Sequence, residues 1–204
     1  EIKPMFPLLE YLNASNCSLR YIQSLASCKM LKRLSITNNS IDDITTLSSL
    51  NELTELYAGY NSISIISSLK NLSKLERLSL PHNTITTADA ISFLKNLVTL
   101  DLSNNTIRDA KFLSNLKSLK YLYLERNQIR DISPLENLTE LEEINLNGCP
   151  ITDYSPLYKL KYLKRITLGE ITKEEMEKLK KIFPDAEINT SSASEYNTVP
   201  DPVN

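Results

Sequence analysis

The chain of 204 residues contains no tryptophan, three glycines, three cysteines and a single histidine. So few glycines leave no Gly-rich loop to cradle a phosphate, and one histidine leaves no metal-ligand spacing of the usual kind. No apolar run approaches the roughly 20 residues of a membrane-spanning helix. With a net charge of -2 and a pI of about 5.6, the chain lacks the strongly basic face of a nucleic-acid-binding protein. We therefore expect a protein that is not an enzyme, holds no cofactor or metal, does not insert into a membrane and does not bind nucleic acid.

What the chain has instead is a leucine at a constant interval of 22 residues, without insertion or deletion. These residues are Leu9, Leu31, Leu53, Leu75, Leu97, Leu119, Leu141 and Leu163. A repeat this strict predicts a solenoid, in which each unit buries its apolar face only by stacking on its neighbours. The chain should therefore form one elongated domain with a long, regular surface open to solvent.

The pattern within each unit predicts a short strand and an irregular return, when positions are counted from the leucine as position 1. Apolar residues alternate at positions 4 and 6, which is typical of a strand with one face inward. Apolar residues at positions 11, 14, 17 and 20 follow a spacing of three, which favours an irregular or 3₁₀-like return. We expect seven strands from the full units and an eighth starting at Leu163, all in one parallel sheet on a concave face, with the returns on the convex face.

Position 9 carries an asparagine in five successive units and a cysteine in two others. The residues are Asn39, Asn61, Asn83, Asn105 and Asn127, with Cys17 and Cys149. Because the chain turns there, buried backbone groups need partners, and an inward amide can both donate and accept. These asparagines are therefore expected to be structural. Cys17 and Cys149 lie six units apart, or roughly 29 Å at ~4.8 Å per strand, and Cys28 lies on the far side of its unit, so no disulfide is expected.

The repeat as a whole resembles the leucine-rich repeats of bacterial internalins and of eukaryotic phosphatase-regulatory proteins. Residues 127–143 and 149–165 look most like internalin repeats. In them Ser133 and Ser155 are expected to cap a short return helix, with Pro134 and Pro156 in its first position. The resemblance implies a leucine-rich-repeat fold and a role in attachment to host or neighbouring-cell proteins. No partner-contacting residue transfers by motif.

The ends of the chain differ from the repeats. We expect an N-terminal flank at 1–8, leucine-rich repeats at 9–170, a C-terminal cap at 171–188 and a disordered tail or linker at 189–204. The cap reads as a helix opened by Thr172, with Glu175 completing a capping box and Pro184 following as a stop. The chain begins with Glu rather than Met, which fits a removed leader and simple trimming equally well.

The titratable residues give little support to an enzyme or a metal protein. His82 falls at position 8, on the rim after a strand, where an exposed histidine is ordinary. Aspartates at position 13 could suggest calcium, but each also suits the cap of its own return, and no dense acidic loop accompanies them. They are Asp43, Asp109, Asp131 and Asp153.

The concave face is the expected functional surface, because positions 3, 5 and 7 point outward from it. Arg33, Glu55 and Arg77 form a ladder of alternating charge, and these charges are expected mainly to neutralise one another. Exposed tyrosines are more informative, because aromatic side chains with a polar tip are favoured at interface hot spots. The candidate partner-binding residues are Tyr57, Tyr60, Arg77, His82, Asp101, Tyr121, Tyr123, Glu125 and Arg126.

The favoured interpretation is a monomeric, non-enzymatic recognition module of a bacterial secreted or cell-surface protein, which binds a protein partner on its concave face. One alternative is an intracellular scaffold or regulatory subunit similar to the phosphatase-regulatory repeats, located in the cytoplasm. Another is a structural spacer, which would have no tight ligand on this face.

Overall fold

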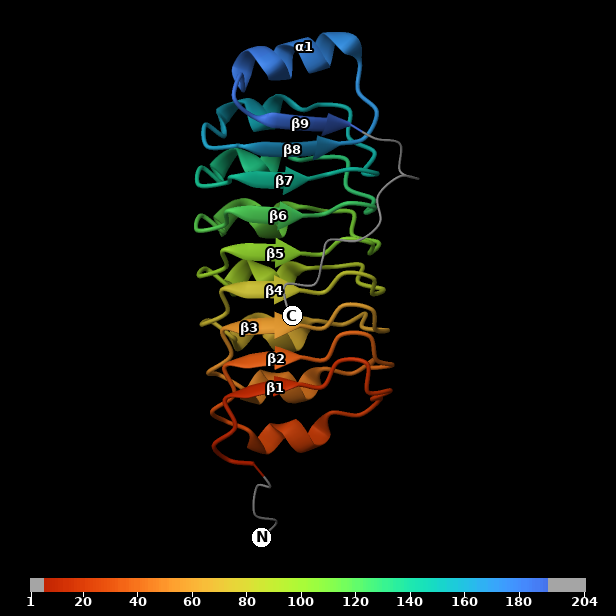
Figure 1. The fold of residues 1–204 in the computed structure, drawn as a ribbon, viewed down its shortest axis with the longest axis vertical. Coiled ribbons are helices and arrows are strands. Elements are labelled where there is room, and N and C mark those ends of the chain that lie inside the picture. The colour runs from red at the N-terminus through yellow and green to blue at the C-terminus, as the bar shows by residue number, and fades with distance from the viewer. Residues whose placement is uncertain (1–5, 191–204) are drawn as a thin grey trace.

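The computed structural model describes residues 6–190, so the expected tail from residue 191 onward lies outside the described residues. Within that range nine parallel strands form one sheet in chain order, β1 to β9 (Figure 1). The strands are β1 Tyr11–Asn13, β2 Arg33–Ser35, β3 Glu55–Tyr57, β4 Arg77–Ser79, β5 Thr99–Asp101, β6 Tyr121–Tyr123, β7 Glu143–Asn145, β8 Arg165–Leu168 and β9 Glu187–Thr190. Each residue of β1 to β7 is paired with the residue 22 positions later, as Leu34 is with Leu56. The predicted parallel sheet is thus confirmed. The edge strand β9 ends at Thr190, so Asn189 and Thr190, expected to belong to the tail, are part of the sheet because they pair with Thr167 and Leu168.

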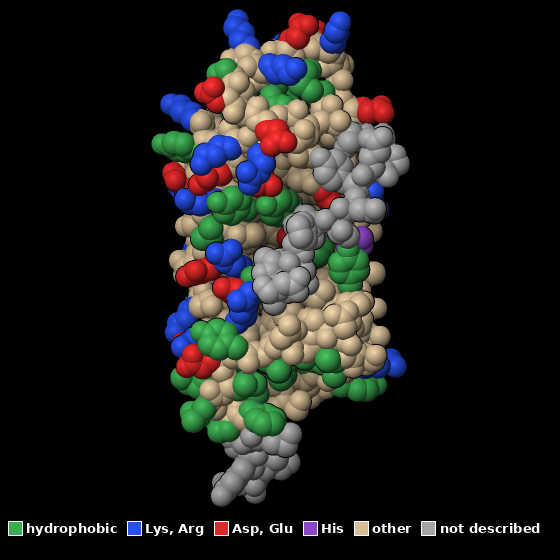
Figure 2. Space-filling view, viewed as in Figure 1, with side chains coloured by type: hydrophobic (Ala, Val, Ile, Leu, Met, Phe, Trp, Pro, Cys, Tyr) green, Lys and Arg blue, Asp and Glu red, His purple; other side chains and the backbone are tan. Residues whose placement is uncertain are grey.

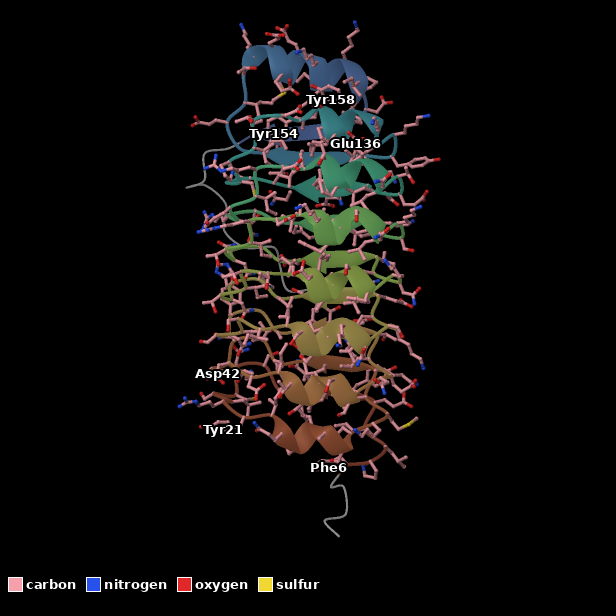
Figure 3. The ribbon with its side chains drawn as sticks, turned by 180° about the vertical axis from the view of Figure 1, so that it is seen from behind. Phe6, Tyr21, Asp42, Glu136, Tyr154 and Tyr158 are labelled. Carbon is pink, nitrogen blue, oxygen red and sulfur yellow. The ribbon has the colours of Figure 1, made fainter. Side chains whose placement is uncertain are left out.

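In the described part of the chain, seven 3₁₀ helices carry the backbone back on the face opposite the sheet, as the spacing of three predicts (Figure 3). They are η1 Gln23–Ser27, η2 Thr45–Ser49, η3 Ser67–Asn71, η4 Asp89–Phe93, η5 Lys111–Asn115, η6 Ser133–Asn137 and η7 Ser155–Lys159. Between the sheet and these helices lies one continuous core of leucine and isoleucine. Within this core each unit packs only against the units before and after it, which makes the fold a solenoid.

The start of each return is held differently from the prediction for Ser133 and Ser155. Neither serine side chain caps its helix; both residues are the first of a 3₁₀ helix. The aspartate two residues earlier accepts the exposed backbone N–H instead: Asp131 Oδ1 lies 2.8 Å from Ser133 N, and Asp153 Oδ1 lies 2.9 Å from Ser155 N. The N-cap residues are Ile132 and Tyr154, so each serine lies one residue past the position from which a side chain accepts the N–H groups of the first turn. The aspartates at position 13 are therefore turn caps.

The asparagines at position 9 connect each turn to the turn of the preceding unit. Asn83 Oδ1 accepts from Ile63 N at 2.9 Å, while its Nδ2 donates to Ala58 O at 3.0 Å and to Leu80 O at 3.1 Å. One amide thus satisfies backbone groups in two successive units. Cys149 occupies the same repeat position, where its thiol, a weaker donor, donates to Leu124 O at 3.2 Å. All three cysteines are free thiols, as expected.

The C-terminal end is closed by α1 Lys173–Ile182, which lies beyond β9 at the end of the stack (Figure 1). Thr172 Oγ1 accepts from Glu175 N at 3.1 Å, as predicted for the cap. The Glu175 side chain does not return to Thr172; its Oε1 accepts from Tyr158 OH at 2.6 Å, and Figure 3 shows Tyr158 beneath the helix. Leu179 is fully buried, so the helix covers the apolar end of the core.

Asn83→Leu should lower the free energy of unfolding by about 1 to 3 kcal/mol, because the backbone groups of Ile63, Ala58 and Leu80 lose their partner in a buried site. The change is measured from the midpoint of urea unfolding followed by circular dichroism. Asn71→Leu, at an exposed position on a return, is the control and should shift stability by less than about 0.5 kcal/mol. Equal midpoints for the wild type and Asn83→Leu would contradict the structural role.

Candidate functional site

The exposed side of the sheet, formed by positions 3, 5, 7 and 8 of each unit and named here the sheet face, carries the predicted site residues. The parallel register places Asp101 beside Tyr123 and Tyr123 beside Asn145 on neighbouring strands. Where Figure 2 shows the described residues of this face, basic and acidic side chains are interspersed. Its parts differ in exposure and in how their charges are paired.

Tyr57 and the charged ladder form one linked group on β2 to β4. Glu55 lies between two arginines, with Oε2 3.2 Å from Arg33 Nε and Oε1 3.8 Å from Arg77 Nε. Tyr57 OH donates to Glu55 Oε2 at 2.8 Å, and the Arg33 guanidinium lies 5.5 Å from the centre of the Tyr57 ring. Burial and this hydrogen bond raise the pKa of Tyr57 to about 12. The ladder therefore neutralises itself, as expected.

The expectation that Tyr57 stands exposed is wrong, because only 4% of the residue is accessible. Its ring lies along its own strand toward Glu55 instead of standing away from the sheet. Asp101 and Glu125 are also more buried than positions 5 and 7 suggest, at 6% and 5% exposure. Their carboxylates therefore meet a drier environment than a solvated strand surface would provide.

Asp101 and Glu125 form an acidic centre on β5 and directly after β6. Asp101 Oδ1 accepts from Ser103 N at 2.9 Å and from Ser103 Oγ at 2.6 Å, and Asn145 Nδ2 donates to Glu125 Oε2. Burial raises the pKa of Asp101 in spite of these hydrogen bonds. Burial and the charge of Asp101 raise the pKa of Glu125, against a smaller opposing effect of Arg126. Within residues 6–190, neither carboxylate forms an ion pair with a lysine or arginine.

Tyr121 and Tyr123, both on β6, flank this acidic centre and are half-buried. Burial, together with the neighbouring Glu143 carboxylate, raises the pKa of Tyr123 well above its ordinary value. Glu143 is itself paired with Arg165, whose Nε lies 2.8 Å from Glu143 Oε2. The charges beyond β6 are therefore matched, like those of the ladder on β2 to β4.

Tyr60 and His82 form a stacked pair at the edge of the sheet face. Their ring centres are 4.1 Å apart and the ring planes differ by 14°. Burial, followed by the positive charge of Arg126, lowers the pKa of His82. At neutral pH the imidazole is therefore uncharged, which suits stacking on a neighbouring ring. His82 is half-buried, more enclosed than the exposed rim predicted for it.

Position 8 has a left-handed backbone in seven successive units, a feature that the sequence reasoning missed. Four units place residues there that tolerate this conformation: Asn16, Asn38, Asn104 and Gly148. The other three place Tyr60, His82 and Arg126 there, with φ of 54°, 52° and 52°. A side chain of this kind costs about 1 to 2 kcal/mol in the left-handed region. The asparagines and the glycine at one repeat position were the signal that could have revealed it.

The structure thus brings most predicted site residues together around β3 to β6. Tyr57 and Arg77 belong to the Glu55 group; Asp101, Tyr121, Tyr123 and Glu125 gather around β5 and β6. Residues that the prediction omitted and that hold this arrangement are Glu55, Ser103, Glu143, Asn145 and Arg165. They could have been found from the 22-residue register, which names the cross-strand neighbours of every candidate.

The described part of the chain shows no group of three or more His, Cys, Asp or Glu side chains suited to a metal ion. Burial raises the pKa of the Cys149 thiol to about 11, which disfavours the thiolate form that a nucleophilic cysteine needs. None of the helices between residues 6 and 190 is long and apolar enough to span a bilayer.

The stacked 22-residue units, the 3₁₀ returns and the row of asparagines define a leucine-rich-repeat solenoid. Residues 95–137 match the family model described as "Leucine Rich repeats (2 copies)". Among curated proteins, none matches the chain in sequence.

Solved structures show which leucine-rich-repeat proteins this chain resembles. An internalin (inlF) from Listeria monocytogenes is 27% identical over 95% of this chain, with a TM-score of 0.83; the match spans 60% of the inlF chain. Internalin C2 (inlC2) from the same organism is 27% identical, with 89% of this chain and 80% of that one covered and a TM-score of 0.83. A leucine-rich-repeat protein of Leptospira interrogans is 26% identical over 83% of this chain and 51% of its own, with a TM-score of 0.73. The repeats therefore resemble those of internalins.

Asp101→Asn tests whether this buried carboxylate is kept at a cost in stability. Burial raises the pKa of Asp101 above its unfolded value of about 3.9, so its contribution to stability is present at low pH and is lost as the pH rises through the folded-state pKa. Asparagine does not ionise, and its Oδ1 can still accept from Ser103 N. The stability of the variant relative to wild type should therefore increase between about pH 4 and pH 7, measured by urea unfolding at each pH.

Asp109→Asn is the matched control of opposite sign. The hydrogen bond from the Lys111 backbone lowers the pKa of Asp109, so its contribution to stability is present above the unfolded pKa and is lost as the pH falls. This variant should lose stability relative to wild type as the pH rises toward about 5, and the difference between the two should then stay constant up to pH 7. If the stability relative to wild type changed in the same direction with pH in both variants, the raised pKa of Asp101 would be contradicted.

Proposed function

We propose that this chain is a non-enzymatic recognition module that binds a protein partner across its sheet face. The leucine-rich-repeat fold typically mediates protein–protein interaction, and it offers here a rigid surface whose side chains can vary without changing the core. Because one fold hosts many functions, the proposal depends on the side chains of this face and not on the fold alone.

The observation that carries the proposal is the contrast between the acidic centre and the charges on either side of it. On β2 to β4 and on β7 to β8, carboxylates are paired with arginines. Between them, Asp101 and Glu125 are buried next to each other without such a partner among residues 6–190. Buried carboxylates in this state are expensive, and a cation that reaches them relieves the cost.

The partner should therefore present a lysine or arginine side chain to Asp101 and Glu125. Tyr121, Tyr123 and the Tyr60–His82 pair would surround it with aromatic surface, which favours binding of a basic side chain and supplies apolar contact area. Tyr57 and Arg77 would support the site by holding Glu55, and Arg126 would border it. A face of mixed charge suits a protein partner better than a nucleic acid.

The same proposal includes a place in the cell. Likeness to two internalins supports a secreted or cell-surface protein of a bacterium. A signal peptide in the gene, together with recovery of the protein from the culture medium or the cell surface, would support it. Recovery from the cytoplasm alone would favour the intracellular scaffold.

Tyr121→Ala and Glu125→Gln should each weaken partner binding by about 1 to 3 kcal/mol, or roughly 5- to 150-fold in Kd. The partner is first captured with the wild-type chain from extracellular protein fractions, and binding to the purified partner is then measured by titration calorimetry. Loss of a tyrosine removes aromatic contact area, and loss of the Glu125 charge removes the attraction for a basic side chain.

Tyr162→Ala is the control for the tyrosine change, because Tyr162 is 59% exposed and lies between η7 and β8, outside the sheet face. It should leave affinity within about twofold of wild type. Full affinity in both sheet-face variants, together with loss in Tyr162→Ala, would move the site off the sheet.

A further inference from the structure

An open hollow of about 690 Å³ lies along the turns that follow β5 to β7, outside the acidic centre. Its lining residues are Arg108, Asn127, Gln128, Arg130, Gly148 and Pro150. Three successive units contribute to it, and we name it the arginine hollow. The two arginines occupy the same repeat position, 12, in adjacent units.

The hollow is open because one of these units has little side-chain volume at two of its turn positions. Positions 8 and 10 carry Arg126 and Gln128 in one unit but Gly148 and Pro150 in the next. Gly148 has a φ of 72°, and an added Cβ would lie 3.2 Å from Arg126 Cγ. A side chain at this position would therefore be both strained and crowded. The glycine, which has no side chain, leaves this side of the hollow open.

Arg108 and Arg130 bring two positive charges to this hollow without an acidic partner. Arg108 Nε donates to Gln128 Oε1 at 2.8 Å, which orients its guanidinium. Within residues 6–190, Arg130 makes no hydrogen bond or ion pair, and Arg108 makes no ion pair. By contrast, Arg33, Arg77 and Arg165 on the sheet face are all paired with glutamates.

The carboxylates nearest in sequence are already engaged elsewhere. Asp109 Oδ1 accepts from Lys111 N at 2.8 Å, and its Oδ2 lies 3.1 Å from Lys111 Nζ. Asp131 Oδ1 accepts from Ser133 N at 2.8 Å. Neighbouring strands of a sheet are about 4.8 Å apart, so an anion between arginines at one repeat position of adjacent units would attract both and reduce their mutual repulsion.

We propose that the arginine hollow binds an oxyanion, a phosphate or sulfate group carried on a larger molecule. A guanidinium presents its N–H groups in a planar fork that matches the oxygens of such groups, and two guanidiniums match a doubly charged anion. Gln128 would hold Arg108 in position, and its amide N–H₂ adds a donor. The volume exceeds that of one oxyanion, which leaves room for the molecule that carries it. This site adjoins the edge of the sheet face at Gly148, but it shares no residue with the proposed protein-binding site and does not depend on it.

The test is a titration of the folded chain with inorganic phosphate and, separately, inorganic sulfate, each against sodium chloride of equal ionic strength. Binding is followed from the Arg Nε–H and Gly148 amide resonances in ¹⁵N NMR spectra. We expect saturable shifts at Arg108, Arg130 and Gly148 with at least one of the two anions, and the tighter of the two identifies the kind of ester. Arg108→Gln with Arg130→Gln should weaken binding by about tenfold or more, since charge-assisted contacts are lost.

Two further variants make the result specific. Arg20→Gln removes an exposed arginine from position 12 of the first unit, which has no arginine in the adjacent unit, and should leave affinity within about twofold. Arg130→Lys keeps the charge but loses the planar fork and should bind more weakly than wild type. Shifts that do not saturate, that appear equally at Arg20, or that persist in the double variant would overturn the proposal. All variants change exposed side chains, so an unchanged melting temperature confirms that they fold.

Discussion

The turn after each strand is the constraint on which the rest of the solenoid depends. There the chain leaves the sheet within a few residues and would bury backbone groups without partners. The position 9 amides remove this cost by bonding to the turn of their own unit and to that of the unit before, as Asn83 does with Leu80 and Ala58. Because each amide must reach the same atoms in the neighbouring unit, a unit with one residue more or fewer would break the row. The constant interval of 22 residues follows from this requirement.

A core fixed in this way leaves the sheet face free to differ from unit to unit. Its outer parts use that freedom to neutralise charge, as Glu55 does between Arg33 and Arg77. At its centre, Asp101 and Glu125 form no ion pair with a lysine or arginine among residues 6–190, and burial raises the pKa of both carboxyl groups. At position 8, Tyr60, His82 and Arg126 adopt a backbone conformation that asparagine or glycine would adopt at lower cost. Side chains kept against their local preference are typical of surfaces selected for binding.

Much of this structure could be predicted from the sequence, and the failures have physical causes. The 22-residue interval predicted the parallel register, and the apolar spacing of three predicted the 3₁₀ returns. Both features depend on contacts between the same repeat positions of successive units. The capping role of Ser133 and Ser155 was wrong because both lie one residue past the N-cap, where Asp131 and Asp153 accept from their backbone N–H groups. The exposure of Tyr57 was wrong because alternation says on which face a side chain lies, not whether it stands up or lies down. Glu55 decided that through a hydrogen bond.

The sequence by itself determined the solenoid, its strand order, its row of structural asparagines and the identity of the residues on the sheet face. These follow from periodicity, which each unit carries within its own 22 residues. Only the tertiary structure decided which of those residues are buried, which charges are paired and where the backbone is left-handed. It also decided that Arg108 and Arg130 line one hollow with Gly148. Such properties arise from side chains of different units that meet only after stacking, so no single repeat contains them.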